Sequence, residues 1–170
     1  MTQHRLVLVR HAKAEQGGRD RDRELTRRGH ADAAAAGEWL AANGAVPEAV
    51  VVSPARRTVQ TWEAAAEQIP SSPDVRYDDR IYDNSVDNLL AALRELDPAT
   101  TTAILVGHNP STHALAVRLA GRAAAATELG EFPTATLAVF DLDGEWGELP
   151  DVQARLVAVA TCRAGKGASE

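Results

Sequence analysis

The side chains with the clearest chemical potential in this chain are arginines and histidines that directly follow short apolar runs. Arg10 and His11 follow LVLV, His108 follows AILVG, and the pair Arg56-Arg57 comes shortly after AVVVS. Arginine makes bidentate contacts to phosphate oxygens, which the point charge of lysine cannot reproduce. One neutral imidazole can attack phosphorus, and a second can donate hydrogen bonds to the developing negative charge. If these side chains meet in one place, they could bind and transfer a phosphoryl group.

Short apolar runs rich in β-branched residues predict the strands that would position these side chains. The predicted strands cover residues 5–10, 49–53, 103–107, 136–142 and 155–161, with a weaker candidate at 74–77. A polar segment that contains glycine joins the last two strands, which favours an antiparallel hairpin at one edge of the sheet.

Four helices are predicted between these strands. They follow Thr26, Ser53-Pro54, Ser85 and Asn109-Pro110, and they end at Asn43-Gly44, before Pro70, at Asp97-Pro98 and near Gly121. The alanine run 123–126 is expected in a helix or a loop. Strands that alternate with helices of this length predict βαβ units, and therefore a three-layer α/β/α sandwich with a mostly parallel central sheet.

This architecture predicts where the polar residues meet. In open α/β sheets, the functional crevice lies at the carboxyl ends of the strands. Arg10, His11 and His108 occupy such ends, and Arg56-Arg57 lie in the first turn of the helix after another strand. Helix N-termini beside them add free N–H groups and partial positive charge. The sequence therefore predicts an anion pocket at one rim of the sheet.

The composition limits the class of protein. A length of 170 residues predicts one domain, over residues 1–163, followed by a flexible tail at 164–170. The net charge of −6 argues against a nucleic-acid partner. One cysteine, Cys162, excludes a disulfide within the chain and fits a reducing compartment. The four-residue apolar stretch near residue 6 is too short for a signal peptide or a membrane span, so we expect a cytoplasmic protein without a membrane partner.

Three motifs resemble those of the histidine phosphatase superfamily, which has a phosphoglycerate mutase-like α/β fold and a phosphohistidine intermediate. The motifs are RHA at 10–12, SPARRTVQT at 53–61 and LVGHNP at 105–110. The resemblance implies that His11 is the nucleophile and that Arg10 stands beside it. It also implies that Arg57, rather than its neighbour, is the phosphate-binding arginine, and that His108 is the second histidine of the pocket.

Within this superfamily the chain resembles the SixA-type phosphohistidine phosphatases. It is short, its first motif continues as RHAKAE, and the segment RIYDNSVDNLLAALREL at 80–96 is similar to one of that branch. Larger members carry an acidic proton donor between the second and third motifs, often beside a glycine. Asp78, Asp79 and Asp83 lie in that interval here, but none sits in a matching motif.

The missing acid favours phosphohistidine as the substrate, because imidazole leaves more readily than an alkoxide, which needs a proton. The resemblance then implies a phosphatase without metal or cofactor, acting on phosphohistidine in a phosphorelay or phosphocarrier protein. The phosphoryl oxygens would bind Arg10, Arg57 and His108 while neutral His11 attacks in line. A histidine of ordinary pKa titrates near ~6.5, so activity is expected to fall in mild acid.

Two alternatives remain open at this point. One is a small-molecule phosphomonoesterase or mutase of the same superfamily that uses Asp83 or a neighbour as its acid. The other is a catalytically inactive module that binds anions and regulates a partner. The sequence does not indicate an oligomeric state.

Several other residues carry weaker expectations. Ala12 stands where the superfamily usually has glycine, and its methyl group is expected to narrow the pocket only slightly. Arg56 is expected to be solvated or to make an accessory phosphate contact. His4, His30 and His113 are expected to be structural or exposed, and no spacing among the histidines predicts a metal site.

Overall fold

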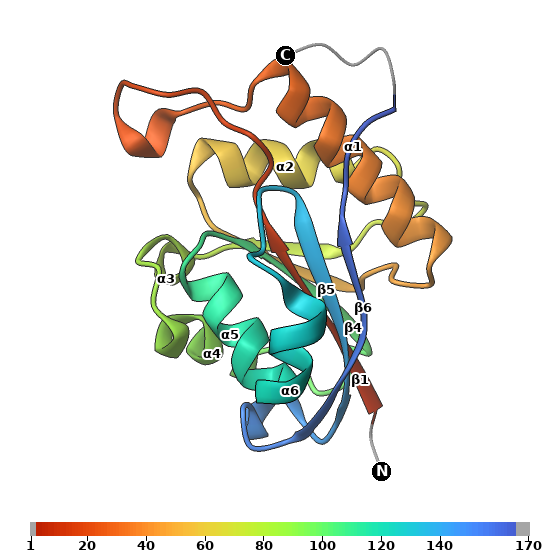
Figure 1. The fold of residues 1–170 in the computed structure, drawn as a ribbon. Helices are drawn as coiled ribbons and strands as arrows, with labels where there is room; N and C mark the ends of the chain where they lie inside the picture. The colour runs from red at the N-terminus through yellow and green to blue at the C-terminus, as the bar shows by residue number, and fades with distance from the viewer. Residues whose placement is uncertain (1–2, 166–170) are drawn as a thin grey trace.

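A mixed six-stranded sheet in the order β3-β2-β4-β1-β5-β6 forms the middle of the computed structural model, which describes residues 3–165 (Figure 1). Its strands are β1 (Gln3–Arg10), β2 (Ala49–Val52), β3 (Asp74–Tyr77), β4 (Thr102–Gly107), β5 (Thr136–Asp143) and β6 (Gln153–Thr161). β1 to β4 are parallel to one another, whereas β5 pairs antiparallel with both β1 and β6. All six predicted strands are confirmed, and so is the antiparallel hairpin at one edge.

Helices cover both faces of this sheet. They are α1 (Arg27–Ala42), α2 (Arg56–Ala66), α3 (Asp79–Tyr82), α4 (Val86–Arg94), α5 (Ser111–Ala120) and α6 (Arg122–Ala124). The pair α1 and α2 lies on one face, and α3 to α6 lie on the other (Figure 1). This is the three-layer arrangement that the alternation of strands and helices predicts.

The helix boundaries follow from local capping. The hydroxyl of Thr26 accepts a hydrogen bond from the N–H of Gly29 at 2.9 Å, and the hydroxyl of Ser85 accepts one from Asn88 at 3.1 Å. The sequence did not predict α3, because four residues are too few to show helical periodicity. The alanine run is helical: it spans the end of α6 and the π-helical turn Ala125–Leu129.

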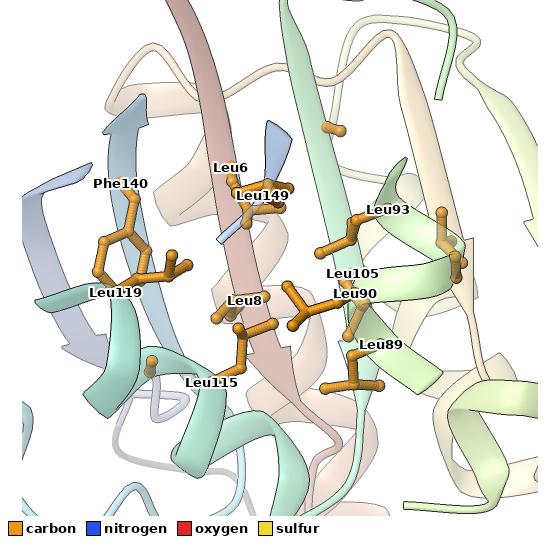
Figure 2. Packing of buried hydrophobic residues seen from close by; sticks show 14 of the residues in the cluster. Leu6, Leu8, Leu89, Leu90, Leu93, Leu105, Leu115, Leu119, Phe140 and Leu149 are labelled. Atoms are coloured by element: carbon orange, nitrogen blue, oxygen red, sulfur yellow. The ribbon is translucent and has the colours of Figure 1, made fainter. Parts of the chain in front are cut away.

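The side chains of β1 divide the hydrophobic core into two halves. Successive side chains of a strand point to opposite faces, and all four apolar residues of β1 are buried. Leu6 and Leu8 pack with leucines of α4 and α5, as Figure 2 shows, whereas Val7 and Val9 pack on the side of α1 and α2. Burial on both faces fixes the register of β1, and with it the place where the strand ends.

The carboxyl terminus of the described chain is held by α1. The backbone N–H of Ala164, in the predicted tail, donates to the carboxylate of Asp32 at 2.8 Å. The rest of the predicted tail, residues 166–170, lies outside the described residues. No helix within residues 3–165 is long and apolar enough to cross a membrane.

Candidate active site

A cavity of about 540 Å³ lies at the carboxyl ends of β1 and β4, where the chain leaves the sheet. Its walls contain Arg10, His11, Lys13, Ala14, Gln16, Asp20, Arg23, Arg57, Asn84, His108, Asn109 and Thr134. All four residues singled out by the motifs are among them. The structure therefore brings together, in one cavity, side chains that are up to 98 positions apart in the chain, from Arg10 to His108.

Strand register explains how the two histidines meet. Arg10 lies opposite Gly107 in the parallel ladder between β1 and β4, so His11 and His108 each follow a paired residue. Their ring centroids are 5.5 Å apart. β2 pairs with the other side of β4, and Arg57 in the first turn of α2 reaches the same cavity from there.

His11 has one ring nitrogen engaged. Its Nδ1 lies 2.7 Å from the carbonyl oxygen of Ala12, which can only accept, so Nδ1 carries the proton and Nε2 keeps its lone pair. Burial lowers the pKa of His11 to about 4, and the charges of Arg57 and Arg10 add to this, although the Ala12 hydrogen bond opposes it. At neutral pH the ring is therefore uncharged, with a lone pair available for attack.

His108 is the second buried imidazole of the cavity. Its Nε2 lies 2.7 Å from the hydroxyl oxygen of Ser53, at the end of β2, and its Nδ1 is buried without a hydrogen-bond partner. Burial lowers the pKa of His108 to about 3, with smaller contributions from His11 and Arg57. This ring is also neutral at neutral pH.

Asp20 is a cavity residue that the sequence did not reveal. It lies in a short 3₁₀ turn between β1 and α1, and its backbone oxygen and carboxylate accept from the two terminal nitrogens of Arg57 at 2.7 and 3.1 Å. Tyr82 donates its hydroxyl to the same carboxylate at 2.8 Å. Hydrogen bonds from Tyr82 and Arg57 lower the pKa of Asp20 to about 2, which keeps it ionised. The only sequence signal was a carboxylate within an arginine-rich loop.

Backbone carbonyls and amides hold the remaining parts of the site. The carbonyl oxygen of Phe132 accepts from Arg10 at 3.2 Å and from the side chain of Asn109 at 2.9 Å, which ties the ends of β1 and β4 to one loop. The side chain of Asn84 donates to the carbonyl of Asn109 at 2.8 Å and accepts from the N–H of Ser111 at 3.0 Å. No motif identified Asn84, because its contribution depends on the path of the chain after α3.

The cavity is basic although the chain as a whole is acidic. Four basic side chains, Arg10, Lys13, Arg23 and Arg57, line it together with the single carboxylate of Asp20. Buried polar groups are normally hydrogen-bonded, yet the Nε–H groups of Arg10 and Arg57 are buried without a partner, as is Nδ1 of His108. The excess of basic side chains makes the cavity suited to an anion.

Other sequence candidates lie outside this cavity. Arg56 pairs with Glu24 at 3.0 Å, which leaves Arg57 as the arginine of the pair in the site. Asp78 binds Arg80, Asp79 binds Arg21, and Asp83 is not among the lining residues. The histidines predicted to be structural or exposed are so: His4 is buried at the far end of β1, His30 is exposed, and His113 stacks on Phe132.

Ala12 also lies outside the cavity. Its side chain is fully buried and packs in a small apolar cluster with Leu25, Ala33 and Ala135. Its backbone N–H donates to the hydroxyl of Thr61 at 3.0 Å. The methyl group therefore fills space behind the site, and it does not narrow the approach to His11.

Metal ions in proteins require a set of ligand side chains that lie close together. Within residues 3–165, no group of three or more histidine, cysteine, aspartate or glutamate side chains is placed to hold a metal ion. The positive charge of the cavity comes from its arginines and its lysine.

Comparison with known proteins places these features in a family. The model of the histidine phosphatase superfamily (branch 1) matches residues 6–88. An uncharacterized protein of Mycobacterium tuberculosis is 36% identical over 156 residues, which are 88% of this chain and 96% of that protein. The structure is similar to that of the provisionally named phosphohistidine phosphatase SixA of Nakamurella multipartitia, with a TM-score of 0.86 and 32% identity over 95% of this chain and 98% of that one.

The same fold also occurs in phosphatases of small molecules. A mycobacterial glucosyl-3-phosphoglycerate phosphatase superimposes with a TM-score of 0.67, at 21% identity, over 96% of this chain and all of that one. At this level of identity, the likeness concerns the fold alone. The fold by itself therefore does not select the substrate.

Proposed function

Because this chain belongs to the histidine phosphatase superfamily, in its SixA-type branch, we propose that it hydrolyses phosphohistidine in a protein through a phospho-His11 intermediate. The observation that carries the proposal is the state of His11: its Nδ1 donates to Ala12, its neutral ring leaves Nε2 free, and it shares a cavity with Arg10, Arg57 and His108. This is the arrangement of a nucleophile beside an anion site.

The first step transfers the phosphoryl group. The lone pair of His11 Nε2 forms a bond to phosphorus while the bond from phosphorus to the substrate nitrogen breaks. Arg10, Arg57 and His108, which line the cavity, would neutralise the charge of the phosphoryl oxygens. Water then attacks phospho-His11, releases inorganic phosphate and returns the ring to its neutral form.

Both steps need imidazole to leave without a negative charge. In phospho-His11, the proton on Nδ1 is held by the carbonyl of Ala12, so the ring departs from phosphorus as neutral imidazole. A substrate phosphohistidine can reach the same state by taking a proton from water on its free ring nitrogen, whose pKa lies near neutrality. Neither leaving group then needs an acid to protonate the ring nitrogen that is bonded to phosphorus.

Among residues 3–165, the lining of the cavity contains no carboxylic acid that is protonated at neutral pH. Asp20 is the only carboxylic residue that lines it in the described chain, and the pKa of Asp20 is lowered to about 2 by its hydrogen bonds to Tyr82 and Arg57. An alkoxide leaving group, as in a phosphomonoester, would depart without assistance from a side-chain acid. This observation favours phosphohistidine over the small-molecule phosphomonoesters that we consider as the alternative.

The test compares three substrates on one enzyme preparation: a phosphohistidine peptide, a phosphohistidine-bearing phosphocarrier protein and p-nitrophenyl phosphate. The expected result is the highest kcat/KM on a phosphohistidine substrate, with a phosphorylated intermediate trapped on His11. The variant His30→Ala, which removes an exposed histidine outside the cavity, is the matched control for His11→Ala. A preference for p-nitrophenyl phosphate would favour the small-molecule alternative, and phosphate binding without turnover would favour an inactive anion-binding module.

A further inference from the structure

We propose that Ser53 is a positioning residue that fixes the tautomer of His108, so that His108 presents an N–H group rather than a lone pair to the phosphoryl group. The inference deepens the proposed function and rests on it for the identity of the bound anion. Its own basis is the set of hydrogen bonds around the buried hydroxyl of Ser53.

Ser53 is held in place by the sheet. It directly follows β2, its N–H donates to the carbonyl of Val106 in β4 at 3.1 Å, and its carbonyl accepts from the hydroxyl of Thr58 at 2.7 Å. The residue is completely buried. Since β4 leads into His108, the pairing that orders Ser53 also sets its distance from that ring.

The hydroxyl of Ser53 has two contacts. The backbone N–H of Ala55 donates to its oxygen at 3.3 Å, which uses one lone pair. The second contact is Nε2 of His108 at 2.7 Å. A serine hydroxyl has a single proton to donate, and a buried donor without an acceptor is rare in folded proteins.

These contacts determine the direction of the hydrogen bond. If Nε2 of His108 carried the proton, it would donate to Ser53, and the serine proton would have no acceptor in its buried position. That tautomer would also leave the lone pair of Nδ1 unpaired, so two buried polar groups would lack a partner. If the serine donates instead, both of its contacts are satisfied, Nε2 is unprotonated, and Nδ1–H of His108 is the one buried group of this pair left to be paired. A neutral imidazole carries one proton, so the proton of His108 lies on Nδ1.

The resulting tautomer explains an otherwise unpaired atom. Nδ1 of His108 is buried and has no hydrogen-bond partner, while its ring lines the cavity beside His11. We infer that Nδ1, as an N–H group, donates to a phosphoryl oxygen once the substrate has displaced the atoms that cover it in the cavity. In the other tautomer, it would direct a lone pair at that oxygen and repel it. Ser53 would therefore act through His108, without touching the substrate.

In both histidines, a hydrogen-bond partner on one ring nitrogen would then fix which nitrogen carries the proton, and the two partners would leave opposite nitrogens free. A carbonyl acceptor holds the proton of His11 on Nδ1 and leaves Nε2 free as a nucleophile. A hydroxyl donor occupies Nε2 of His108 and leaves Nδ1–H free as a hydrogen-bond donor. The hydrogen-bond partner of each ring would therefore decide whether that ring acts as the nucleophile or as a hydrogen-bond donor.

The test is ¹⁵N NMR of the histidine side chains at neutral pH, with the His108 signals identified by the variant His108→Gln. We expect wild-type protein to show a protonated Nδ1 and an unprotonated Nε2. In Ser53→Ala, the population with protonated Nε2 should rise, and kcat/KM should fall by about 10- to 100-fold. Ser53→Thr, which keeps the hydroxyl, should restore the wild-type tautomer.

Ser111→Ala is the matched control, because the Ser111 hydroxyl donates to the backbone carbonyl of His108 at 3.1 Å and does not touch the ring. It should leave the tautomer unchanged. A protonated Nε2 in the wild-type protein would overturn the proposal, even if the Ser53 variants did not fold. So would an unchanged tautomer in folded Ser53→Ala. If the wild-type protein hydrolyses none of the three substrates, the proposed function fails, whereas the tautomer measurement still decides the role of Ser53.

Discussion

β1 carries a buried histidine at each end, and the two differ in what their nitrogens contact. Near the start of the strand, Nδ1 of His4 lies 2.8 Å from the carbonyl of Gly144, and its Nε2 lies 3.1 Å from that of Pro98. After the end of the strand, His11 has only Nδ1 engaged. Their exposed fractions, 3% and 8%, do not separate them. An unengaged ring nitrogen and a place in the cavity, rather than burial, distinguish His11, the proposed nucleophile, from His4.

The surroundings of the two rings differ as well. His4 packs against the indole of Trp146, with ring centroids 4.7 Å apart, and joins three segments of the chain. His11 lies among Arg10, Arg57 and Arg23, whose charges contribute to its lowered pKa. One end of β1 therefore contributes to the packing of the fold, and the other end lies in a basic cavity that we propose binds the phosphoryl group.

Of the substitutions that distinguish the two ends of β1, His11→Ala is expected to have the largest effect on activity. Loss of the nucleophile should lower phosphatase activity by more than about a thousandfold, as removal of a covalent nucleophile does in other enzymes. The melting temperature should change little, since the side chain borders a cavity. Steady-state kinetics and a thermal melt on one sample check both parts, and substantial residual turnover in a folded sample would contradict the assignment of His11.

Substitutions of two neighbouring arginines test how positive charge contributes to the cavity at the His11 end of β1. Arg57→Lys should lower kcat/KM by about a hundredfold, because a lysine lacks the planar fork that holds Arg57 on Asp20 at the cavity and that can bind phosphoryl oxygens. Arg56→Lys is the matched control: that side chain is exposed and paired with Glu24 outside the cavity, so its replacement should have little effect. Equal losses of kcat/KM in the two variants would contradict a specific role for the Arg57 guanidinium in the cavity.

His4→Ala should have the opposite profile to His11→Ala. It removes a buried ring and the hydrogen bond that its N–H group makes to one of the two neighbouring carbonyls, so the free energy of unfolding should fall by about 2–4 kcal/mol. The folded fraction should retain its phosphatase activity. Urea unfolding measured beside kinetics checks this, and a specific loss of turnover without loss of stability would remove the distinction between the two ends.

The smallest effect concerns pH. The sequence predicts a fall of activity in mild acid, but burial and nearby arginines lower the pKa of His11 to about 4, so the fall is expected at a lower pH. Because protonation removes the attacking lone pair, activity declines only as the pH approaches that value. Between pH 7 and 5.5, kcat/KM corrected for substrate ionisation should fall less than about twofold, whereas a histidine of ordinary pKa would give about tenfold.

A control for the pH experiment is an acid-induced unfolding curve over the same range. The folded-state pKa values of His11 and His108 are both lowered, so the unfolded state binds more protons below about 6.5 and stability falls as the pH drops from there. Activity must therefore be measured where circular dichroism shows folded protein. A tenfold loss at pH 5.5 in folded enzyme would show that His11 titrates near its ordinary value.

The order of the elements could be predicted from local patterns. Apolar runs bounded by turn residues gave all six strands, and capping residues such as Thr26 and Ser85 placed helix starts to within about a residue. The arginine-histidine motifs identified four cavity residues before any tertiary contact was known. α3 was missed because a four-residue helix has no periodic signal.

The partners of these side chains could not be predicted in the same way. Asp20 meets Arg57 across 37 positions, Tyr82 meets Asp20 across 62, and Ser53 meets His108 across 55. Such contacts depend on loop paths and on which strands become neighbours, and neither property is encoded in a local pattern. The lowered pKa values of His11 and His108 belong to the same class, because burial is a property of the folded chain.

The sequence alone determined the layered α/β architecture, the end of β1 at Arg10 and the kinds of side chain available for phosphoryl chemistry, because hydrophobic periodicity and residue type are local. Only the tertiary structure decided which nitrogen of each histidine is free, that Asp20 holds Arg57 at the cavity, and that the carboxylate of Asp20 stays ionised. The physical reason is that hydrogen-bond direction and desolvation are set by neighbours in space, and parallel strand pairing brings those neighbours from distant parts of the chain.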